Sequence, residues 1–440
     1  MILYVEPSRG LRGRISVPGD KSISHRAAIL AALGQGTTRI DGFLESSDCL
    51  ATLRCLSLLG VPIERLSPGS YQIMGRGQEG FREPKNVLDC GNSGTTMRLL
   101  AGVLAVQPCF SVLTGDASLR TRPMARVIEP LRSMGAQIYG RVDHTRAPLA
   151  IVGSRNLQGQ THELPIASAQ VKSAIMLAGL SANGKTRVKE PARSRNHTEV
   201  MLQYLGVPVD IDGLSVTVTG GTIPQGGHII VPGDISSAAY LMVAGSILPN
   251  SDFTVENVGI NPTRTGVITV LQAMGADLSV EPKAGGGEPR GNIRVRSSEL
   301  EGIEIGGDII PTLIDELPVL AVAAAFAKGT TRIRDAAELR VKECDRITIM
   351  SQELARLGVA IEEQADGWVV RGGQRILGGK TCGHGDHRVV MALAVLGLGG
   401  EGPLCIQGAD AVGVSFPGFC STFGQLGAQL EERAKDAKLM

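Results

Sequence analysis

A short phrase recurs six times along the chain, and its spacing limits the folds that the chain can adopt. Each copy reads Leu or Met, Gly, Val or Ala, any residue, then an aliphatic residue, at intervals of roughly 70 residues. Gly directly after a helical stretch is a typical helix stop. The copies are centred on Gly60, Gly135, Gly206, Gly275, Gly358 and Gly427.

Each phrase follows a segment rich in Ala, Leu and Met and a short strand-like segment, such as Val319–Ala327 and then Thr330–Ile333. Because these helices carry almost no charge, they should be buried on all sides. Helices inside a shell of sheets would satisfy this requirement. We therefore predict an α/β fold built from six similar units.

The tetrapeptide Val-Pro-Gly-Asp occurs twice, at Val17–Asp20 and at Val231–Asp234. Six units and two such segments divide as three plus three, so we expect two like domains joined at these two places. One domain would be discontinuous, with residues 1–19 and 234–440, and the other would contain residues 20–233. A chain of 440 residues is also too long for one ordinary core.

Composition excludes several classes of function. The formal net charge of +1 argues against broad binding of nucleic acid or of a membrane surface. The apolar runs are too short to span a bilayer, and the first residues do not resemble a signal peptide. No two of the eight cysteines form a CxxC pair, so we expect neither a zinc site nor a disulfide scaffold. These features predict a cytoplasmic protein.

Cations and small residues gather at two places where apolar helices begin and in a loop that follows the second. Lys21, Ser22 and Arg26 follow the first Val-Pro-Gly-Asp copy, and a helix N-terminus with such side chains suits an anion. The Gly91–Arg98 segment is a small-residue turn that could cradle a phosphate or carboxylate, or could be a plain N-cap. Arg120, Arg122 and Arg126 follow it, and taken alone they would be a solvated basic loop.

Two acidic residues lie among cations later in the chain. Asp315 opens the fifth unit, and Glu343 lies between Lys342 and Arg346, an environment that can tune a general acid or base. In isolation, a surface ion-pair helix would be the usual explanation. His384 and His387 near Arg388 have the spacing of metal ligands, but no further ligand is apparent in the sequence.

Several of these motifs together resemble the 5-enolpyruvylshikimate-3-phosphate synthase family, in its bacterial class II branch, over essentially the whole chain. The motifs are Pro18–Arg26, Gly91–Arg98, Arg122-Pro123-Met124, Ser168-Ala169-Gln170, Lys342–Arg346 and Asp386-His387-Arg388. The resemblance implies an inside-out α/β barrel in each of two domains, with βαβαββ-type units, three per domain. It also implies transfer of the enolpyruvyl group of phosphoenolpyruvate to the 5-hydroxyl of shikimate 3-phosphate in an interdomain cleft, without metal or cofactor, by a monomer.

Site residues follow from the resemblance by position. Those implied for shikimate 3-phosphate are Lys21, Ser22, Arg26, Ser168, Ala169, Gln170, Arg195, Asp315 and Lys342. Those implied for phosphoenolpyruvate are Lys21, Gly94, Arg122, Gln170, Arg346 and Arg388. Lys21, Asp315 and Glu343 would be catalytic, with Asp315 as proton acceptor and Glu343 as the acid. Because that acid must be protonated at neutral pH, we expect a raised pKa for Glu343.

Two alternatives are weaker. The UDP-N-acetylglucosamine enolpyruvyl transferases share the fold, but their usual acid is a Cys before the Arg-Pro pair, and Gly115–Arg120 contains none. A non-catalytic repeat scaffold would distribute its charges evenly among units, whereas only some units here carry the cations. Val414 also departs from the family, because some relatives have a Lys there that contacts phosphoenolpyruvate.

Overall fold

The computed structural model describes residues 1–434, which divide into two compact units. Unit 1 contains Met1–Pro18, Pro232–Ala284 and the chain from Pro289 onward, and unit 2 contains Gly19–Val231 and Gly285–Glu288. The chain passes between the units within each Val-Pro-Gly-Asp copy. The loop around Gly285–Glu288 is a further link, because His197 Nδ1 lies 2.9 Å from Glu288 Oε1 inside unit 2.

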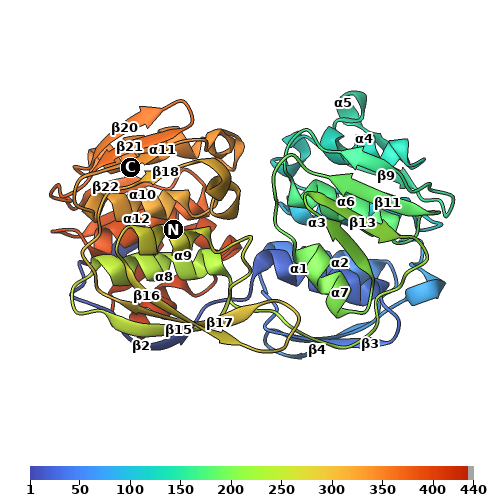
Figure 1. The fold of residues 1–440 in the computed structure, drawn as a ribbon, viewed down its shortest axis with the longest axis horizontal. Helices are drawn as coiled ribbons and strands as arrows, with labels where there is room; N and C mark the ends of the chain where they lie inside the picture. Colours follow the sequence, from blue (N-terminus) through green and yellow to red (C-terminus); the bar gives the residue numbers. More distant parts are fainter. Residues whose placement is uncertain (435–440) are drawn as a thin grey trace. The chain divides into compact units, whose positions relative to one another are not determined.

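Each unit contains three four-stranded sheets, and all six sheets have the same pairing scheme (Figure 1). One outer pair of strands is parallel and the other two pairs are antiparallel. Six copies of one sheet confirm the predicted α/β repeat, with three repeats in unit 1 and three in unit 2.

In unit 2 the sheets are, in spatial order, β14 (His228–Ile230), β3 (Thr37–Asp41), β5 (Ser70–Met74) and β4 (Ile63–Ser67); β6 (Leu88–Asp89), β7 (Phe110–Thr114), β9 (Arg146–Val152) and β8 (Gln137–Gly140); and β10 (Thr161–Glu163), β11 (Lys185–Lys189), β13 (Ser215–Thr219) and β12 (Val209–Asp212). In unit 1 they are β16 (Asp277–Lys283), β17 (Arg290–Arg296), β15 (Asp252–Gly259) and β2 (Arg12–Ser16); β18 (Glu304–Ile305), β19 (Thr330–Ile333), β21 (Gly367–Arg371) and β20 (Ala360–Gln364); and β22 (Gly379–Cys382), β23 (Leu404–Gln407), β1 (Ile2–Val5) and β24 (Leu430–Arg433).

The helices alternate between central and peripheral positions along the chain. Those of unit 2 are α1 (Lys21–Leu33), α2 (Ser47–Leu58), α3 (Gly94–Ala105), α4 (Ala125–Ser133), α5 (Arg141–His144), α6 (Ala169–Gly179) and α7 (His197–Tyr204). Those of unit 1 are α8 (Ile235–Ile247), α9 (Gly266–Ala273), α10 (Leu317–Phe326), α11 (Arg346–Arg356), α12 (His387–Leu398) and α13 (Phe419–Gln425).

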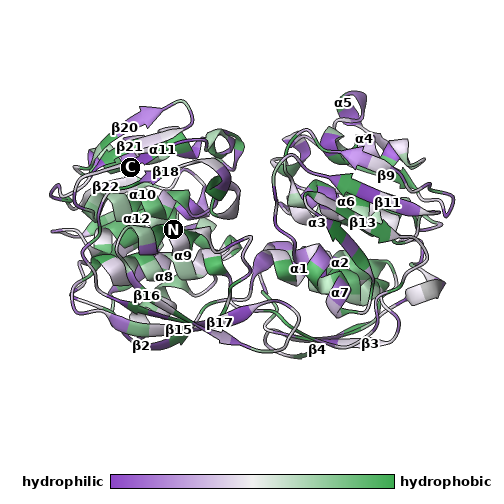
Figure 2. Ribbon diagram, in the orientation of Figure 1, coloured by the Kyte–Doolittle hydropathy of each residue, from purple (hydrophilic) through white to green (hydrophobic). Residues whose placement is uncertain are grey.

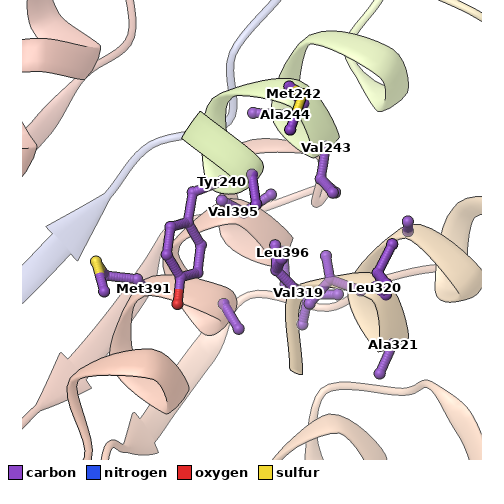
Figure 3. Packing of buried hydrophobic residues seen from close by; sticks show 14 of the residues in the cluster. Tyr240, Met242, Val243, Ala244, Val319, Leu320, Ala321, Met391, Val395 and Leu396 are labelled. Carbon is purple, nitrogen blue, oxygen red and sulfur yellow. The ribbon is translucent and has the colours of Figure 1, made fainter. Parts of the chain in front are cut away.

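One apolar helix from each repeat packs in the centre of its unit. In unit 1, α8, α10 and α12 contact one another, and side chains such as Tyr240, Val319 and Leu396 fill the space between them (Figure 3). Every residue from Leu317 to Ala325 is buried, which confirms the prediction for the uncharged helices. These helices consist mostly of hydrophobic residues, whereas the sheets contain both hydrophobic and hydrophilic residues (Figure 2). Burying each large aliphatic side chain contributes about 1.5–3 kcal/mol.

The six glycines of the repeated phrase have one backbone conformation. Their φ angles run from 80° to 103°, a left-handed region that other residues enter only with strain. Each follows the C-terminal turn of a peripheral helix, as predicted. The repeated Gly therefore ends six equivalent helices.

No helix in residues 1–434 is long and apolar enough to cross a membrane. All eight cysteines lie in this range and are free thiols.

Candidate functional site

Three central helices of unit 2 begin at the segments that the sequence marks for anion binding. A side-chain oxygen caps each helix: Asp20 Oδ1 accepts from Ile23 N at 2.9 Å, Ser93 Oγ from Thr96 N at 3.1 Å, and Ser168 Oγ from Val171 N at 3.5 Å. The remaining N–H groups and the positive end of each helix dipole are available to an anion. Lys21, Ser22, Gly94, Ala169 and Gln170 lie in these first turns.

Arg26 is held by uncharged oxygens. Its guanidinium donates to Thr198 Oγ1 and Ser173 Oγ, both at 2.8 Å, and to Ser22 O at 3.0 Å. Burial lowers the pKa of Arg26 to about 10, and the positive charge of Arg195 acts in the same direction. The charges of Glu199 and Asp20 act in the opposite direction and raise the pKa of Arg26.

Gly94 lies between two guanidinium groups. A Cβ atom built on Gly94 would lie 3.1 Å from Arg98 Nη1 and 3.5 Å from Arg122 Nη1. Arg122 donates to Asn92 Oδ1 at 2.6 Å, and Arg98 donates to Gln170 Oε1 at 2.6 Å. Burial, together with the charges of Arg126 and Arg122, lowers the pKa of Arg98 to about 9. Arg98 was not among the predicted site residues, although it ends the Gly91–Arg98 motif.

Two charged groups near these helices have carboxylate partners. Lys21 Nζ lies 2.5 Å from Asp48 Oδ2, at the start of α2. The buried Lys172 Nζ lies 2.7 Å from both Glu190 Oε2 and Glu199 Oε1. Lys172 is thus a structural cation, although its sequence repeats the Lys-Ser pair of Lys21 and Ser22.

A buried chain of hydrogen bonds links the beginnings of α1 and α3. His25 Nδ1 lies 2.7 Å from Thr52 Oγ1, which lies 2.7 Å from Thr96 Oγ1. Thr96 in turn donates to Ser93 Oγ, the cap of α3, at 2.7 Å. Burial holds the pKa of His25 well below its ordinary value, and Lys21 and Arg26 lower it further, so the imidazole is neutral.

Unit 1 gathers its predicted residues around arginines that have carboxylate partners. Arg346 is almost fully buried, with Nε 2.7 Å from Asp386 Oδ2, Nη2 2.5 Å from Glu343 Oε2 and Nη1 3.5 Å from Asp315 Oδ1. Arg388 donates to Asp315 O at 3.0 Å, and its Nη2 lies 3.8 Å from Asp315 Oδ2. Asp315 therefore lies beside Arg346 and Arg388, the two arginines of unit 1 that the resemblance assigns to phosphoenolpyruvate.

The expected raised pKa of Glu343 is wrong for the free protein. Burial would raise the pKa, but the charges of Arg346 and His387 outweigh it and hold the pKa at about 2. The sequence places Arg346 three residues away but does not give the 2.5 Å contact that decides the sign.

Lys342 and the two histidines lie near this cluster with other partners. Lys342 Nζ lies 2.8 Å from Glu338 Oε1, and His384 Nε2 lies 3.0 Å from Glu353 Oε1. Burial lowers the pKa of His387 to about 3, with help from the charge of Arg388. In the part of the chain that the structure describes, no group of three His, Cys, Asp or Glu side chains is placed to hold a metal ion.

Arg264 and Glu316 are buried charges that the sequence analysis missed. Arg264 Nη2 lies 3.6 Å from both Asp234 Oδ1 and Glu316 Oε1, and it donates to Ser236 Oγ at 2.7 Å. Glu316 Oε1 also lies 3.8 Å from Arg388 Nη1. The only sequence signal was the position of Glu316 next to Asp315.

Comparisons with known proteins agree with this geometry. Residues 5–423 match a family model described as EPSP synthase (3-phosphoshikimate 1-carboxyvinyltransferase). Two curated relatives with the name 3-phosphoshikimate 1-carboxyvinyltransferase are similar over nearly their full lengths. The one from Desulforamulus reducens is 51% identical and covers 95% of this chain and 98% of the relative. The one from Desulforudis audaxviator is 53% identical and covers 97% and 99%.

Solved structures give the same result. An EPSP synthase from Acinetobacter baumannii has a TM-score of 0.92 at 45% identity, covering 98% of this chain and 99% of that one. The enolpyruvyl transferase NikO from Streptomyces tendae has a TM-score of 0.77 at 15% identity and covers 98% of each chain. The second likeness concerns the fold alone.

Proposed function

Because this chain belongs to the EPSP synthase family, we infer that it transfers the enolpyruvyl group of phosphoenolpyruvate to the 5-hydroxyl of shikimate 3-phosphate. Phosphate is released, and the product leads to chorismate and the aromatic amino acids. The observation that carries this conclusion is the similarity, at 51% and 53% identity over nearly the full length, to two relatives named 3-phosphoshikimate 1-carboxyvinyltransferase. Those names also disfavour UDP-N-acetylglucosamine as the acceptor.

We propose that the residues of both units act on the same pair of substrates. Each substrate carries a phosphate and a carboxylate, so binding both requires surplus cations. Lys21, Ser22, Arg26, Ser168, Ala169, Gln170, Arg195, Asp315 and Lys342 would bind shikimate 3-phosphate. Lys21, Gly94, Arg122, Gln170, Arg346 and Arg388 would bind phosphoenolpyruvate. The contacts of Arg26 and Arg122 with uncharged oxygens support this assignment, because their charges are still available to an anion.

Asp315 and Glu343 supply the proton transfers in this proposal. The oxygen of the 5-hydroxyl attacks C2 of phosphoenolpyruvate while Asp315 accepts the hydroxyl proton. Glu343 donates a proton to the methylene carbon. Collapse of the tetrahedral intermediate then removes a methyl proton and protonates the departing phosphate. Asp315 lies 3.5 Å from Arg346 and 3.8 Å from Arg388, and these two arginines hold its carboxylate in position.

Glu343 must gain its proton when substrate binds. With a pKa of about 2 the free side chain is ionised at neutral pH. The charges of bound phosphoenolpyruvate would compete for Arg346 and so raise the pKa of Glu343. Ternary-complex formation in an Asp315→Asn background, which stops turnover, should take up about one proton at neutral pH. Calorimetry in buffers of different ionisation enthalpy measures this uptake. Equal uptake in Asp315→Asn/Glu343→Gln would remove Glu343 as the acid.

A phosphate-release assay tests the reaction itself. Phosphoenolpyruvate with shikimate 3-phosphate should release phosphate, and phosphoenolpyruvate with UDP-N-acetylglucosamine should not. Release only in the second mixture would overturn the assignment. We also propose that the enzyme is a cytoplasmic monomer, which fits its eight free thiols.

A further inference from the structure

We propose that Glu316 is a positioning residue for Arg388, and that through it the second Val-Pro-Gly-Asp copy takes part in phosphoenolpyruvate binding. This inference rests on the proposed function of Arg388. It concerns a side chain that lies next to Asp315 in sequence but has its own set of partners.

The Glu316 carboxylate connects the beginning of α8 to Arg388. It is fully buried, and it accepts a hydrogen bond from the Ser236 hydroxyl. Its Oε1 lies 3.6 Å from Arg264 Nη2 and 3.8 Å from Arg388 Nη1. Ser236 lies in the first turn of α8, directly after the second Val-Pro-Gly-Asp copy, and Asp234 of that copy caps the helix. One buried carboxylate thus lies within reach of two guanidinium groups and a hydroxyl.

A carboxylate placed between two guanidinium groups can hold both of them in position. A buried charge is costly unless it is paired and hydrogen-bonded, so the four groups have few alternative arrangements. Arg388 is the member of the set that reaches the surface, with 13% of its side chain exposed, whereas Arg264 and Glu316 are almost completely enclosed. The enclosed pair is therefore a fixed support beneath an arginine that can meet a substrate.

Asp315 cannot give this support by itself during turnover. Its carboxylate lies 3.8 Å from Arg388 Nη2, but in the proposed mechanism it accepts a proton and loses its charge. Glu316 is sealed from solvent and has no role in that proton transfer. Glu316 therefore remains a fixed neighbour of Arg388 while Asp315 takes part in the reaction.

A purely structural role for Glu316 makes a different prediction. If Glu316 only neutralises Arg264, removal of both charges should leave substrate binding unchanged. If it positions Arg388, removal of both should restore stability without restoring the affinity for phosphoenolpyruvate. The pair of variants Glu316→Gln and Arg264→Gln/Glu316→Gln separates these roles.

The experiment measures KM for each substrate in the phosphate-release assay, together with thermal unfolding followed by the fluorescence of Trp368, the single Trp of the chain. Glu316→Gln should raise KM for phosphoenolpyruvate about tenfold or more, while KM for shikimate 3-phosphate changes less than about twofold. The double variant should regain most of the lost melting temperature and keep the raised KM.

Glu353→Gln is the matched control. Glu353 is a buried carboxylate in the same unit, it also accepts a hydrogen bond from a hydroxyl, that of Thr381, and it lies 3.3 Å from Arg356. This variant should lower the melting temperature without changing KM for phosphoenolpyruvate.

A double variant with the KM of the unmodified enzyme would overturn the proposal, as would an equal rise in KM for both substrates. If the single variant does not fold, the double variant carries the test. Ser236→Ala keeps every charge and removes only the hydroxyl that bonds Glu316, and it should raise KM for phosphoenolpyruvate a few-fold. An unchanged KM in Ser236→Ala would also count against the proposal. Failure of the unmodified enzyme to release phosphate would instead refute the proposed function.

Discussion

The arginines proposed to bind substrate have opposite surroundings in the two units. In unit 2, Arg26 and Arg122 of this set, like the neighbouring Arg98, donate to hydroxyl, amide and carbonyl oxygens. In unit 1, Arg346 and Arg388 lie against the carboxylates of Asp315, Glu316, Glu343 and Asp386. The same type of side chain thus has its charge available in one unit and largely balanced in the other.

This difference matches the chemistry proposed for each unit. Anion binding needs positive charge that neighbouring groups have not already neutralised, and this costs stability in the empty protein. Proton transfer needs acids and bases that are held at defined positions, and arginines among carboxylates provide that. The two Val-Pro-Gly-Asp copies also differ. After Asp20, Arg26 has uncharged hydrogen-bond partners, although Lys21 is paired with Asp48, whereas Ser236 follows Asp234 and joins a closed ionic cluster.

The largest expected effect is on stability, and it tests the contrast directly. Arg346→Met leaves the fully buried Asp386 without its cation, so the free energy of unfolding should fall by about 3–5 kcal/mol. Arg98→Met removes a buried cation whose partner is the Gln170 amide, so the free energy of unfolding should stay equal or rise. Urea denaturation of both variants measures this difference. Equal losses would show that the two environments do not differ in energy.

A second test uses a simple anion in place of substrate. If the cations of unit 2 are available, sulfate should stabilise the protein by about 1.4 kcal/mol at a concentration tenfold above its Kd. Arg122→Met should remove most of this gain in calorimetric melting, with chloride at equal ionic strength as the reference. Arg65→Met is the control, because the exposed Arg65 is paired with Glu45 and should not affect the response to sulfate. A full sulfate response in Arg122→Met would mean that the anion binds elsewhere.

The fold could be predicted from the sequence because its determinants are local and repeated. Gly60 and its five counterparts each end a helix by the same backbone rule, and the uncharged Val319–Ala327 segment could be satisfied only inside a core. The helix beginnings that carry Lys21, Gly94 and Ser168 were visible for the same reason. Each is a short motif whose cap and first turn lie within a few residues.

The electrostatics could not be predicted in the same way. The pKa of Glu343 depends on a contact with a buried guanidinium, and the partners of Glu316 come from three separate segments at Ser236, Arg264 and Arg388. A single isolated Arg such as Arg264 carries no motif. The direction and size of a pKa shift depend on the distances to neighbouring charges and on burial, and tertiary packing fixes both.

The last prediction concerns the neutral hydrogen bonds that hold unit 2 together. Thr52 Oγ1 joins His25 of α1 to Thr96 of α3, so Thr52→Val removes two buried hydrogen bonds, and His25 Nδ1 loses its partner while Thr96 keeps its bond to Ser93. The free energy of unfolding should fall by about 1–3 kcal/mol, and KM should rise slightly for both substrates because both helix N-termini lose a common support. Thr186→Val is a close control in the same unit, because the buried Thr186 hydroxyl has no hydrogen-bond partner among residues 1–434. That change should be neutral or stabilising. If Thr52→Val were equally neutral, the hydrogen-bond chain would not contribute to unit 2, and its central helices would depend on apolar packing alone.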